Sequence, residues 1–245
     1  LWINNRNGTF TEMLSSAFKH TSNSAMGNDV GDINNDGLMD LFITDMHSDM
    51  SAHISPDKEE RKSDIQWAES HLQSGGMSIY GNSFFQQQAD GSYAEISNEI
   101  GAENYWPWGL SVADINADGF QDAFLTSSMN FPFRYGVNSL LLNDRGQVFR
   151  DAEFILGVEP RKNGETAKAW FRLDCAGTDA GNSLCASRQG TIEIWGALGS
   201  RSSAIFDLDN DGDLDIVTNE FNAQPMVLIS DLSDRKADLK FLKVS

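Results

Sequence analysis

Acidic side chains recur at alternate positions in three nine-residue segments of this chain. Residues 207–215 read DLDNDGDLD, with carboxylates at positions 1, 3, 5 and 9 and a glycine at position 6. Residues 32–40 (DINNDGLMD) and 114–122 (DINADGFQD) repeat the arrangement with asparagine at position 3. Hard oxygen ligands crowded into one short turn are what Ca²⁺ requires. The glycine permits the sharp turn that gathers these oxygens around one point.

The three segments therefore predict about three calcium sites. In each, the side chains at positions 1, 3, 5 and 9 and the backbone carbonyl at position 7 are the expected ligands. The predicted ligands are Asp32, Asn34, Asp36, Leu38 and Asp40 in loop 1, Asp114, Asn116, Asp118, Phe120 and Asp122 in loop 2, and Asp207, Asp209, Asp211, Asp213 and Asp215 in loop 3.

Two other interpretations of these loops stay open. The first six positions match the start of an EF-hand loop, but that motif needs a bidentate Glu at position 12 and flanking helices. Position 12 is Ile43, Leu125 or Thr218 here, and the flanks resemble strands. Alternatively, the segments are acidic turns without a metal. That arrangement crowds like charges that repel one another unless a cation neutralises them.

Short apolar runs on both sides of each loop indicate strands. Residues 41–44, 123–126 and 216–218 are apolar, β-branched or aromatic, and apolar pairs precede each loop. Each calcium loop thus joins the strands of a hairpin. Residues 1–12, 82–93 and 138–149 predict a second kind of hairpin, with a glycine in its turn. Two hairpins form one four-stranded blade, so we predict an all-β fold, a partial β-propeller of three to four blades.

This pattern also predicts how the single propeller fragment, residues 1–245, is divided. Blade repeats are expected at about 1–20, 25–97, 108–154 and 203–245, with insertions at about 46–80 and 158–200. The first insertion predicts a small helix that begins near Ser55-Pro56. The second predicts two additional strands, 169–173 and 191–195, with a cysteine-containing loop between them.

The only two cysteines, Cys175 and Cys185, lie in this second insertion. Their spacing excludes a CxxC metal site, and a local disulfide is the preferred interpretation over two separate buried thiols. A disulfide and calcium loops both favour a compartment outside the cytosol.

Composition narrows the class of partner. The formal net charge of −18 argues against nucleic-acid binding, because phosphates would be repelled. Eleven aspartates of the three loops supply much of this charge. No apolar run is long enough to span a membrane. Because Leu1-Trp2-Ile3 resembles the middle of a strand, we infer that the chain is a piece of a longer protein.

Residues that could act in catalysis form no recognisable motif. None of the four histidines belongs to an HExxH sequence, and no nucleophile motif is present, so we predict no catalytic residues. His47 and His53 lie near Asp45 and Asp49. We interpret them as exposed loop histidines in preference to ligands of a transition metal. Two interpretations apply to the tryptophans of segment 106–108 (WPW). One is stacking on a sugar ring, and the other, which we favour, is packing between blades.

The loops resemble those of FG-GAP and VCBS repeats, which form the calcium-binding blades of integrin-α-like propellers. Residues 106–114 (WPWGLSVAD) resemble the tryptophan–glycine lead into a metal loop in the cartilage acidic protein and ASPIC/UnbV group. Residues 207–219, the stretch 222–228 and residues 241–244 resemble the last repeat before the ASPIC/UnbV module, which is absent from this chain. The resemblance implies an extracellular, Ca²⁺-bound β-propeller of an adhesion or surface protein.

Two functional hypotheses follow from the sequence. The first is a structural, adhesion or ligand-binding module in the extracellular space or on the cell surface (the periplasm or outer-membrane surface in a bacterium). Its partner would be a protein or glycan of the surface or matrix, besides the rest of the parent chain. The alternative is a propeller-fold lyase or hydrolase acting on polysaccharide. A groove lined by tryptophan, tyrosine and free carboxylates would favour the enzyme.

Overall fold

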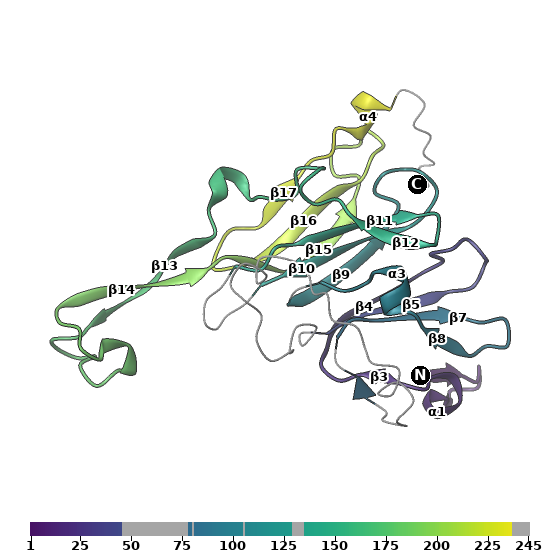
Figure 1. Ribbon diagram of the computed structural model, residues 1–245, viewed down its shortest axis with the longest axis horizontal. Helices are drawn as coiled ribbons and strands as arrows, with labels where there is room; N and C mark the ends of the chain where they lie inside the picture. Colours follow the sequence, from purple (N-terminus) through teal and green to yellow (C-terminus); the bar gives the residue numbers. More distant parts are fainter. Residues whose placement is uncertain (46–77, 80, 105, 129–134, 237–245) are drawn as a thin grey trace.

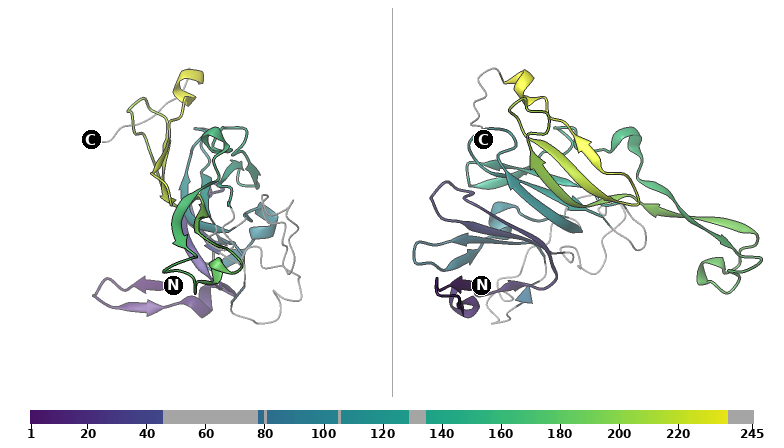
Figure 2. Two further views of the ribbon diagram at one scale, coloured as in Figure 1. Left: turned by 90° about the vertical axis from the view of Figure 1, so that its left-hand side faces the viewer. Right: turned by 180° about the vertical axis from the view of Figure 1, so that it is seen from behind.

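Short strands, nearly all paired in antiparallel fashion, dominate the structure. The computed structural model describes residues 1–45, 78–79, 81–104, 106–128 and 135–236 (Figure 1). Three sheets of three or four strands fan out beside one another, and a long two-stranded arm projects from them (Figures 1 and 2). The all-β class predicted from the sequence is confirmed.

The first sheet, called blade A, has the strand order β4-β5-β7-β8. Its alternating side chains place Phe42 of β5 opposite Phe84 of β7, as expected for period-two strands that bury one face. The tight turn between β7 and β8 carries Gly91 with φ of 84°, a left-handed conformation that favours glycine. The strands are β4 (Ala25–Gly31), β5 (Asp40–Asp45), β7 (Ser83–Gln87) and β8 (Tyr93–Glu95).

Blade B repeats this arrangement as β9-β10-β11-β12, and its central strand β10 is buried along its whole length. The described part of blade C has three strands in the order β15-β16-β17. Blade B comprises β9 (Pro107–Ala113), β10 (Asp122–Ser127), β11 (Ser139–Asp144) and β12 (Val148–Asp151). Blade C comprises β15 (Gly199–Phe206), β16 (Asp215–Phe221) and β17 (Met226–Leu228).

Neighbouring blades approach most closely along their first strands. A Cβ atom on Gly27 of β4 would lie 2.9 Å from the carbonyl oxygen of Trp108 in β9. A Cβ on Gly109 of β9 would lie 2.8 Å from the Cα of Ser202 in β15. Both distances are shorter than real Cβ contacts, so a larger residue would push the strands apart. The first strands of blades A, B and C thus pack side by side, as propeller blades do around their axis.

Two apolar clusters fill the spaces between the blades. One lies between blades A and B and contains Phe42, Phe84 and Phe149, whose rings are 5.6–6.1 Å apart. The other lies between blades B and C and contains Phe124, Leu140 and Ile216. Aromatic rings at these separations stabilise the contact beyond the area that they bury. Trp108 also packs between blades, because the Arg201 guanidinium lies 3.7 Å from its ring centroid.

Short elements complete the body of the molecule. The β1–β2 hairpin is exposed, and the two-residue strands β3 and β6 pair in parallel. The remaining elements of the body are β1 (Trp2–Asn4), β2 (Phe10–Glu12), α1 (Leu14–Ala17), β3 (Thr21–Ser22), β6 (Ser78–Ile79), α3 (Ser97–Ile100), the 3₁₀ turn Lys162–Gly164 and α4 (Leu232–Arg235). The helix predicted near Ser55, together with His47 and His53, lies outside the described residues.

The second insertion forms a projecting arm. Strands β13 (Ala167–Asp174) and β14 (Thr191–Ala197) pair along their length, as the sequence predicted (Figures 1 and 2). At its tip, which includes the 3₁₀ turn Ser183–Cys185, Cys175 and Cys185 form the predicted disulfide. The disulfide packs with Leu173 and Ile194 in a small cluster of the arm's own, apart from the clusters between the blades.

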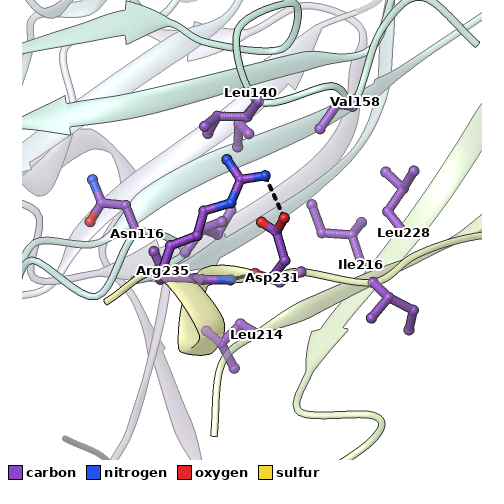
Figure 3. Close-up of a pocket in the computed structure, with 13 residues that line it drawn as sticks. Asn116, Leu140, Val158, Leu214, Ile216, Leu228, Asp231 and Arg235 are labelled. Carbon is purple, nitrogen blue, oxygen red and sulfur yellow. Dashed lines mark hydrogen bonds and ion pairs between the residues drawn. The ribbon is translucent and has the colours of Figure 1, made fainter. Parts of the chain in front are cut away.

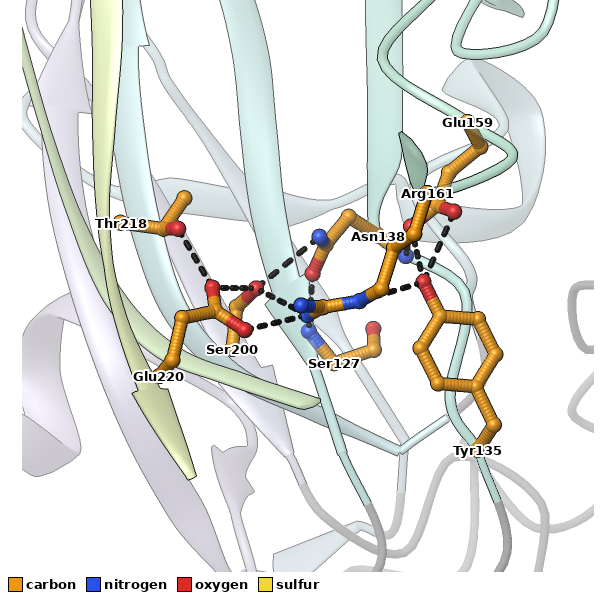
Figure 4. A network of polar contacts seen from close by, with 8 residues as sticks. All are labelled: Ser127, Tyr135, Asn138, Glu159, Arg161, Ser200, Thr218 and Glu220. Carbon is orange, nitrogen blue, oxygen red and sulfur yellow. Dashed lines mark hydrogen bonds and ion pairs between the residues drawn. The ribbon is translucent and has the colours of Figure 1, made fainter. Parts of the chain in front are cut away.

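A buried polar network, called the Arg161 cluster, joins blades B and C where the arm leaves the body (Figure 4). The Arg161 guanidinium forms an ion pair with Glu220 at 2.5 Å, and the exposed fractions of the two side chains are 8% and 0%. Arg161 Nε also donates to the Tyr135 hydroxyl at 2.8 Å, which in turn donates to Glu159 at 2.7 Å. The cluster consists of Ser127, Tyr135, Asn138, Glu159, Arg161, Ser200, Thr218 and Glu220.

Candidate metal-binding loops

The three acidic loops share one backbone conformation. Each connects the first two strands of a blade, and in each the residues at positions 4 and 6 have positive φ. The φ values are 59°, 53° and 66° for Asn35, Ala117 and Asn210, and 84°, 94° and 101° for Gly37, Gly119 and Gly212. Glycine and asparagine tolerate this left-handed conformation better than other residues do, which explains their use here. The expectation of three equivalent strand–loop–strand units is confirmed.

The carboxylate at position 1 gathers the backbone amides of the turn. Asp32 accepts hydrogen bonds from the amides of Asp36 and Gly37, both at 2.9 Å. In loop 2 the position 1 carboxylate accepts the corresponding bonds at 3.0 and 2.9 Å. In loop 3, Asp207 accepts from the Asp211 amide at 3.1 Å. These bonds fold each loop back on itself.

The carboxylate at position 9 is buried and ties the loop to the third strand of its blade or, in loop 3, to the segment directly after that strand. Asp122 accepts from the Ile115 amide within the loop at 2.9 Å and from the Asn143 amide of β11 at 2.8 Å. Asp40 and Asp215 repeat this pattern with the amides of Gln87 and Ser230, at 2.9 and 2.8 Å. Position 9 therefore holds the blade together as well as facing the turn, a role that the spacing alone did not predict.

Burial makes the ionised form of these position 9 carboxylates costly. Desolvation raises the pKa of Asp122 to about 6, although three backbone amides favour its charged form. Desolvation likewise raises the pKa of Asp40, with further contributions from the negative charges of Asp36 and Asp32. A cation held by these loops would oppose both shifts, because it stabilises the carboxylates in their charged form.

Positions 3 and 5 distinguish loop 3 from the other two. In loop 1 the Asn34 side-chain amide donates to the Asp36 carboxylate at 2.9 Å, and Asn116 donates to Asp118 at 3.0 Å in loop 2. Loop 3 has Asp209 at position 3, and its carboxylate does not donate when it is ionised. Two acidic groups therefore face each other there, whereas an amide and a carboxylate are paired in loops 1 and 2.

Loop 3 brings its carboxylates close enough to share one ion. Oxygen atoms of Asp207, Asp209 and Asp215 all lie within 4.8 Å of one another. Two oxygens bound at about 2.3–2.6 Å to one Ca²⁺ are at most about 5 Å apart, so this donor set fits that ion. Partial desolvation and the charges of Asp211 and Asp215 raise the pKa of Asp209, as expected where like charges crowd.

Position 7 is another position at which loop 3 differs from loops 1 and 2. The amides of Leu38 and Phe120 donate to the position 5 carboxylates at 2.8 and 2.9 Å. Asp213 occupies this position in loop 3, and its side chain is buried, with Oδ2 accepting from the Ser233 amide at 2.7 Å. Its Oδ1 atom has no hydrogen-bond partner among the described residues. An orphaned carboxylate oxygen in an acidic loop is consistent with a nearby cation.

Loop 1 contacts loop 2 directly, and residues outside the loops add further contacts to both. The Asn35 side chain of loop 1 donates to the Gly119 carbonyl of loop 2 at 2.9 Å. Asn143 of β11 donates to the Ile33 carbonyl of loop 1 at 2.7 Å. Lys236, directly after α4, contacts the Ala117 carbonyl of loop 2. Sequence reasoning missed Asn143 and Lys236, because neither belongs to the repeated spacing.

A cavity of about 190 Å³ lies between blades B and C, beside loops 2 and 3 (Figure 3). Its walls are mainly apolar, and its rim carries the ion pair of Arg235 with Asp231 at 2.5 Å. The labelled lining residues are Asn116, Leu140, Val158, Leu214, Ile216, Leu228, Asp231 and Arg235. The cavity thus lies beside both loop 2 and loop 3. The same two loops are linked by α4, which contacts loop 3, and by Lys236, which contacts loop 2.

Comparisons with known proteins address the family of the chain. No curated protein matches it at a significant level. Within the part of the chain that the structure describes, no helix is long and apolar enough to cross a membrane. Residues 1–43 and 63–125 match the family model described as FG-GAP-like repeat, and these ranges include loops 1 and 2. The match supports the FG-GAP repeat family for this part of the chain, and the blades built on it have a β-propeller-type fold.

Proposed function

We propose that this chain is a calcium-binding β-propeller module of an extracellular or cell-surface protein. The observation that carries the proposal is the convergence of the Asp207, Asp209 and Asp215 oxygens to within 4.8 Å in loop 3. When bound, Ca²⁺ would supply positive charge that offsets the mutual repulsion of the loop carboxylates. The chain's own residues hold the loops in place, since the position 9 carboxylates bond the third strand of blades A and B and, in blade C, Ser230 just after that strand.

The residues of loops 1 and 2 fit the same role. Both keep an oxygen-bearing side chain at positions 1, 3, 5 and 9, the left-handed turn and the burial of the position 9 acid. We expect loop 3 to bind most tightly, because Asp209 replaces the asparagine of the other loops and adds one negative charge to the ligand set. The proposed ligands at position 7 are the backbone carbonyls of Leu38, Phe120 and Asp213.

The arm and the fold support a role in binding outside the cytosol. A disulfide joins Cys175 and Cys185, and such bonds persist in oxidising compartments. FG-GAP-like repeats build modules that often bind other molecules, so we propose a protein or glycan of the surface or matrix as the partner. The finer resemblance to the cartilage acidic protein and ASPIC/UnbV group belongs to this proposal. No specific observation among the described residues favours the alternative of a polysaccharide-processing enzyme.

Thermal unfolding tests the calcium proposal. Metal-stripped protein should melt at a lower temperature in EGTA than in millimolar Ca²⁺, because an ion that binds only the folded state stabilises it by mass action. Asp207→Ala should reduce this gain. Asp90→Ala is a matched control, because Asp90 lies in the exposed β7–β8 turn and bonds only to Ser92 among the contacts described. Coincident curves in EGTA and Ca²⁺ would show that the loops are not calcium sites.

A further inference from the structure

The third loop receives a hydrogen bond from outside its own sequence. The Ser233 hydroxyl of α4 donates to Asp211 Oδ2, the position 5 carboxylate, at 2.6 Å. In loops 1 and 2 the corresponding Oδ2 atom accepts from the position 3 asparagine at 2.9 and 3.0 Å. The same carboxylate oxygen thus has one side-chain donor in every loop. Only in loop 3 does that donor come from 22 residues farther along the chain.

We propose that Ser233 is a positioning residue of the third metal loop, where its hydroxyl replaces the amide that position 3 supplies elsewhere. The inference rests on the proposed calcium function and specifies how one of its sites is built. Asp209 at position 3 adds a ligand charge but removes the donor that orients position 5. Ser233 restores that donor without reducing the charge of the ligand set, because its hydroxyl is neutral and donates to Asp211 Oδ2.

Contacts on both sides hold α4 where this bond can form. On the side of loop 3, the Ser233 backbone amide donates to Asp213 Oδ2 at 2.7 Å. On the side of loop 2, Lys236 contacts the carbonyls of Ala117 and Asn116. Because the amide contact to Asp213 does not involve the Ser233 hydroxyl, a variant that lacks only the hydroxyl keeps α4 attached. The orientation of Asp211 can therefore be tested apart from the docking of the helix.

Position 7 fits the same explanation. Loops 1 and 2 have apolar residues there, Leu38 and Phe120, whereas Asp213 of loop 3 is 2% exposed and accepts from α4. The two substitutions that set loop 3 apart, at positions 3 and 7, are thus both connected with one residue of α4. Removing an outer partner that orients a metal ligand typically weakens metal affinity about 10- to 100-fold.

Hydrogen–deuterium exchange measured during a Ca²⁺ titration reports on each loop separately. Metal-stripped protein is titrated, and the calcium midpoint is read from peptides that cover 32–40, 114–122 and 207–215. Ser233→Ala should raise the midpoint of 207–215 at least about tenfold and leave that of 32–40 unchanged. Ser233→Thr, which keeps a hydroxyl, should stay within about threefold of the wild type.

A double-mutant cycle isolates the proposed replacement. Asp209→Asn gives loop 3 the amide donor of the other loops, so Ser233→Ala should cost much less in that background than in the wild type. Equal costs in both backgrounds, or an unchanged 207–215 midpoint in Ser233→Ala, would overturn the role of Ser233 while loops 1 and 2 still bind calcium. If no loop responds to Ca²⁺, the proposed function fails, and this inference fails with it.

Discussion

Removal of the Glu220 side chain tests whether the Arg161 cluster holds blades B and C together. Glu220 lies at the end of β16 and accepts from Ser200 at 2.6 Å and Thr218 at 2.5 Å, besides its ion pair with Arg161 (Figure 4). Glu220→Ala leaves the guanidinium without its closest counter-ion in an environment from which water is largely excluded. The buried Arg161 charge then lacks most of its compensation.

The expected cost follows from how deeply the pair is buried. Both side chains are at most 8% exposed, and breaking such a pair by removing one partner typically costs about 3–5 kcal/mol. Tyr135 still accepts from Arg161 Nε, which places the estimate at the lower end, about 3 kcal/mol. Replacing Arg161 and Glu220 together with methionine should cost much less than Glu220→Ala, because no uncompensated charge is left behind.

Urea unfolding at fixed Ca²⁺, monitored by tryptophan fluorescence, measures these costs. The arm offers a matched control, since Arg172 pairs with Glu193 at 2.8 Å with exposed fractions of 75% and 37%. Glu193→Ala should cost at most about 1 kcal/mol, as exposed ion pairs typically do. If Glu220→Ala is as mild as Glu193→Ala, or if the double methionine variant is the least stable of the set, the reasoning from burial is wrong.

Two further predictions concern the arm and the pH dependence of the Arg161 cluster. Replacing Cys175 and Cys185 with serine should lower the free energy of local opening of the arm by about 2–3 kcal/mol, as expected for a loop of separation 10, while the melting of the blades stays unchanged. Exchange rates of residues 167–197 measure this, and equal protection with and without the disulfide would contradict it. Desolvation raises the pKa of Glu159 above 4.5, so the stability that this carboxyl contributes is present below pH 4.5 and is lost as pH rises through its folded-state pKa. The stability of Glu159→Gln relative to the wild type should therefore improve as pH rises above 4.5. Urea titrations at several pH values measure this, and a difference in unfolding free energy that stays constant would refute the raised pKa of Glu159.

Local patterns made the blades and loops predictable. The loops repeat a nine-residue spacing between apolar runs, and both features depend only on neighbours in the sequence. The same holds for the arm, where strand-like runs flank the two cysteines. In each case a short segment closes on itself, so its geometry follows from its own residues. The position 4 conformation could have been inferred as well, because asparagine occurs there in two of the three loops.

Contacts between distant residues were not predictable in this way. Asn143 and Ile33 lie 110 residues apart, and Ser233 and Asp211 lie 22 apart with no repeat to relate them. Position 9 shows why spacing alone is incomplete. The acid at 122 matched the ligand pattern, but its bond to the Asn143 amide depends on the third strand pairing beside it. A residue can satisfy a motif and also serve a second role that only the folded sheet provides.

The acidic loops and the Arg161 cluster lie at opposite ends of the same strands. Asp122 begins β10 and Ser127 ends it, while Asp215 begins β16 and Glu220 follows near its other end. Blades B and C are thus joined by polar contacts at both ends, with the apolar cluster of Phe124 between them. At the loop end these contacts involve carboxylates whose charges repel unless a cation is bound. From the proposed calcium function we therefore predict that removal of the ion loosens the loop end first and leaves the end held by Arg161 in place.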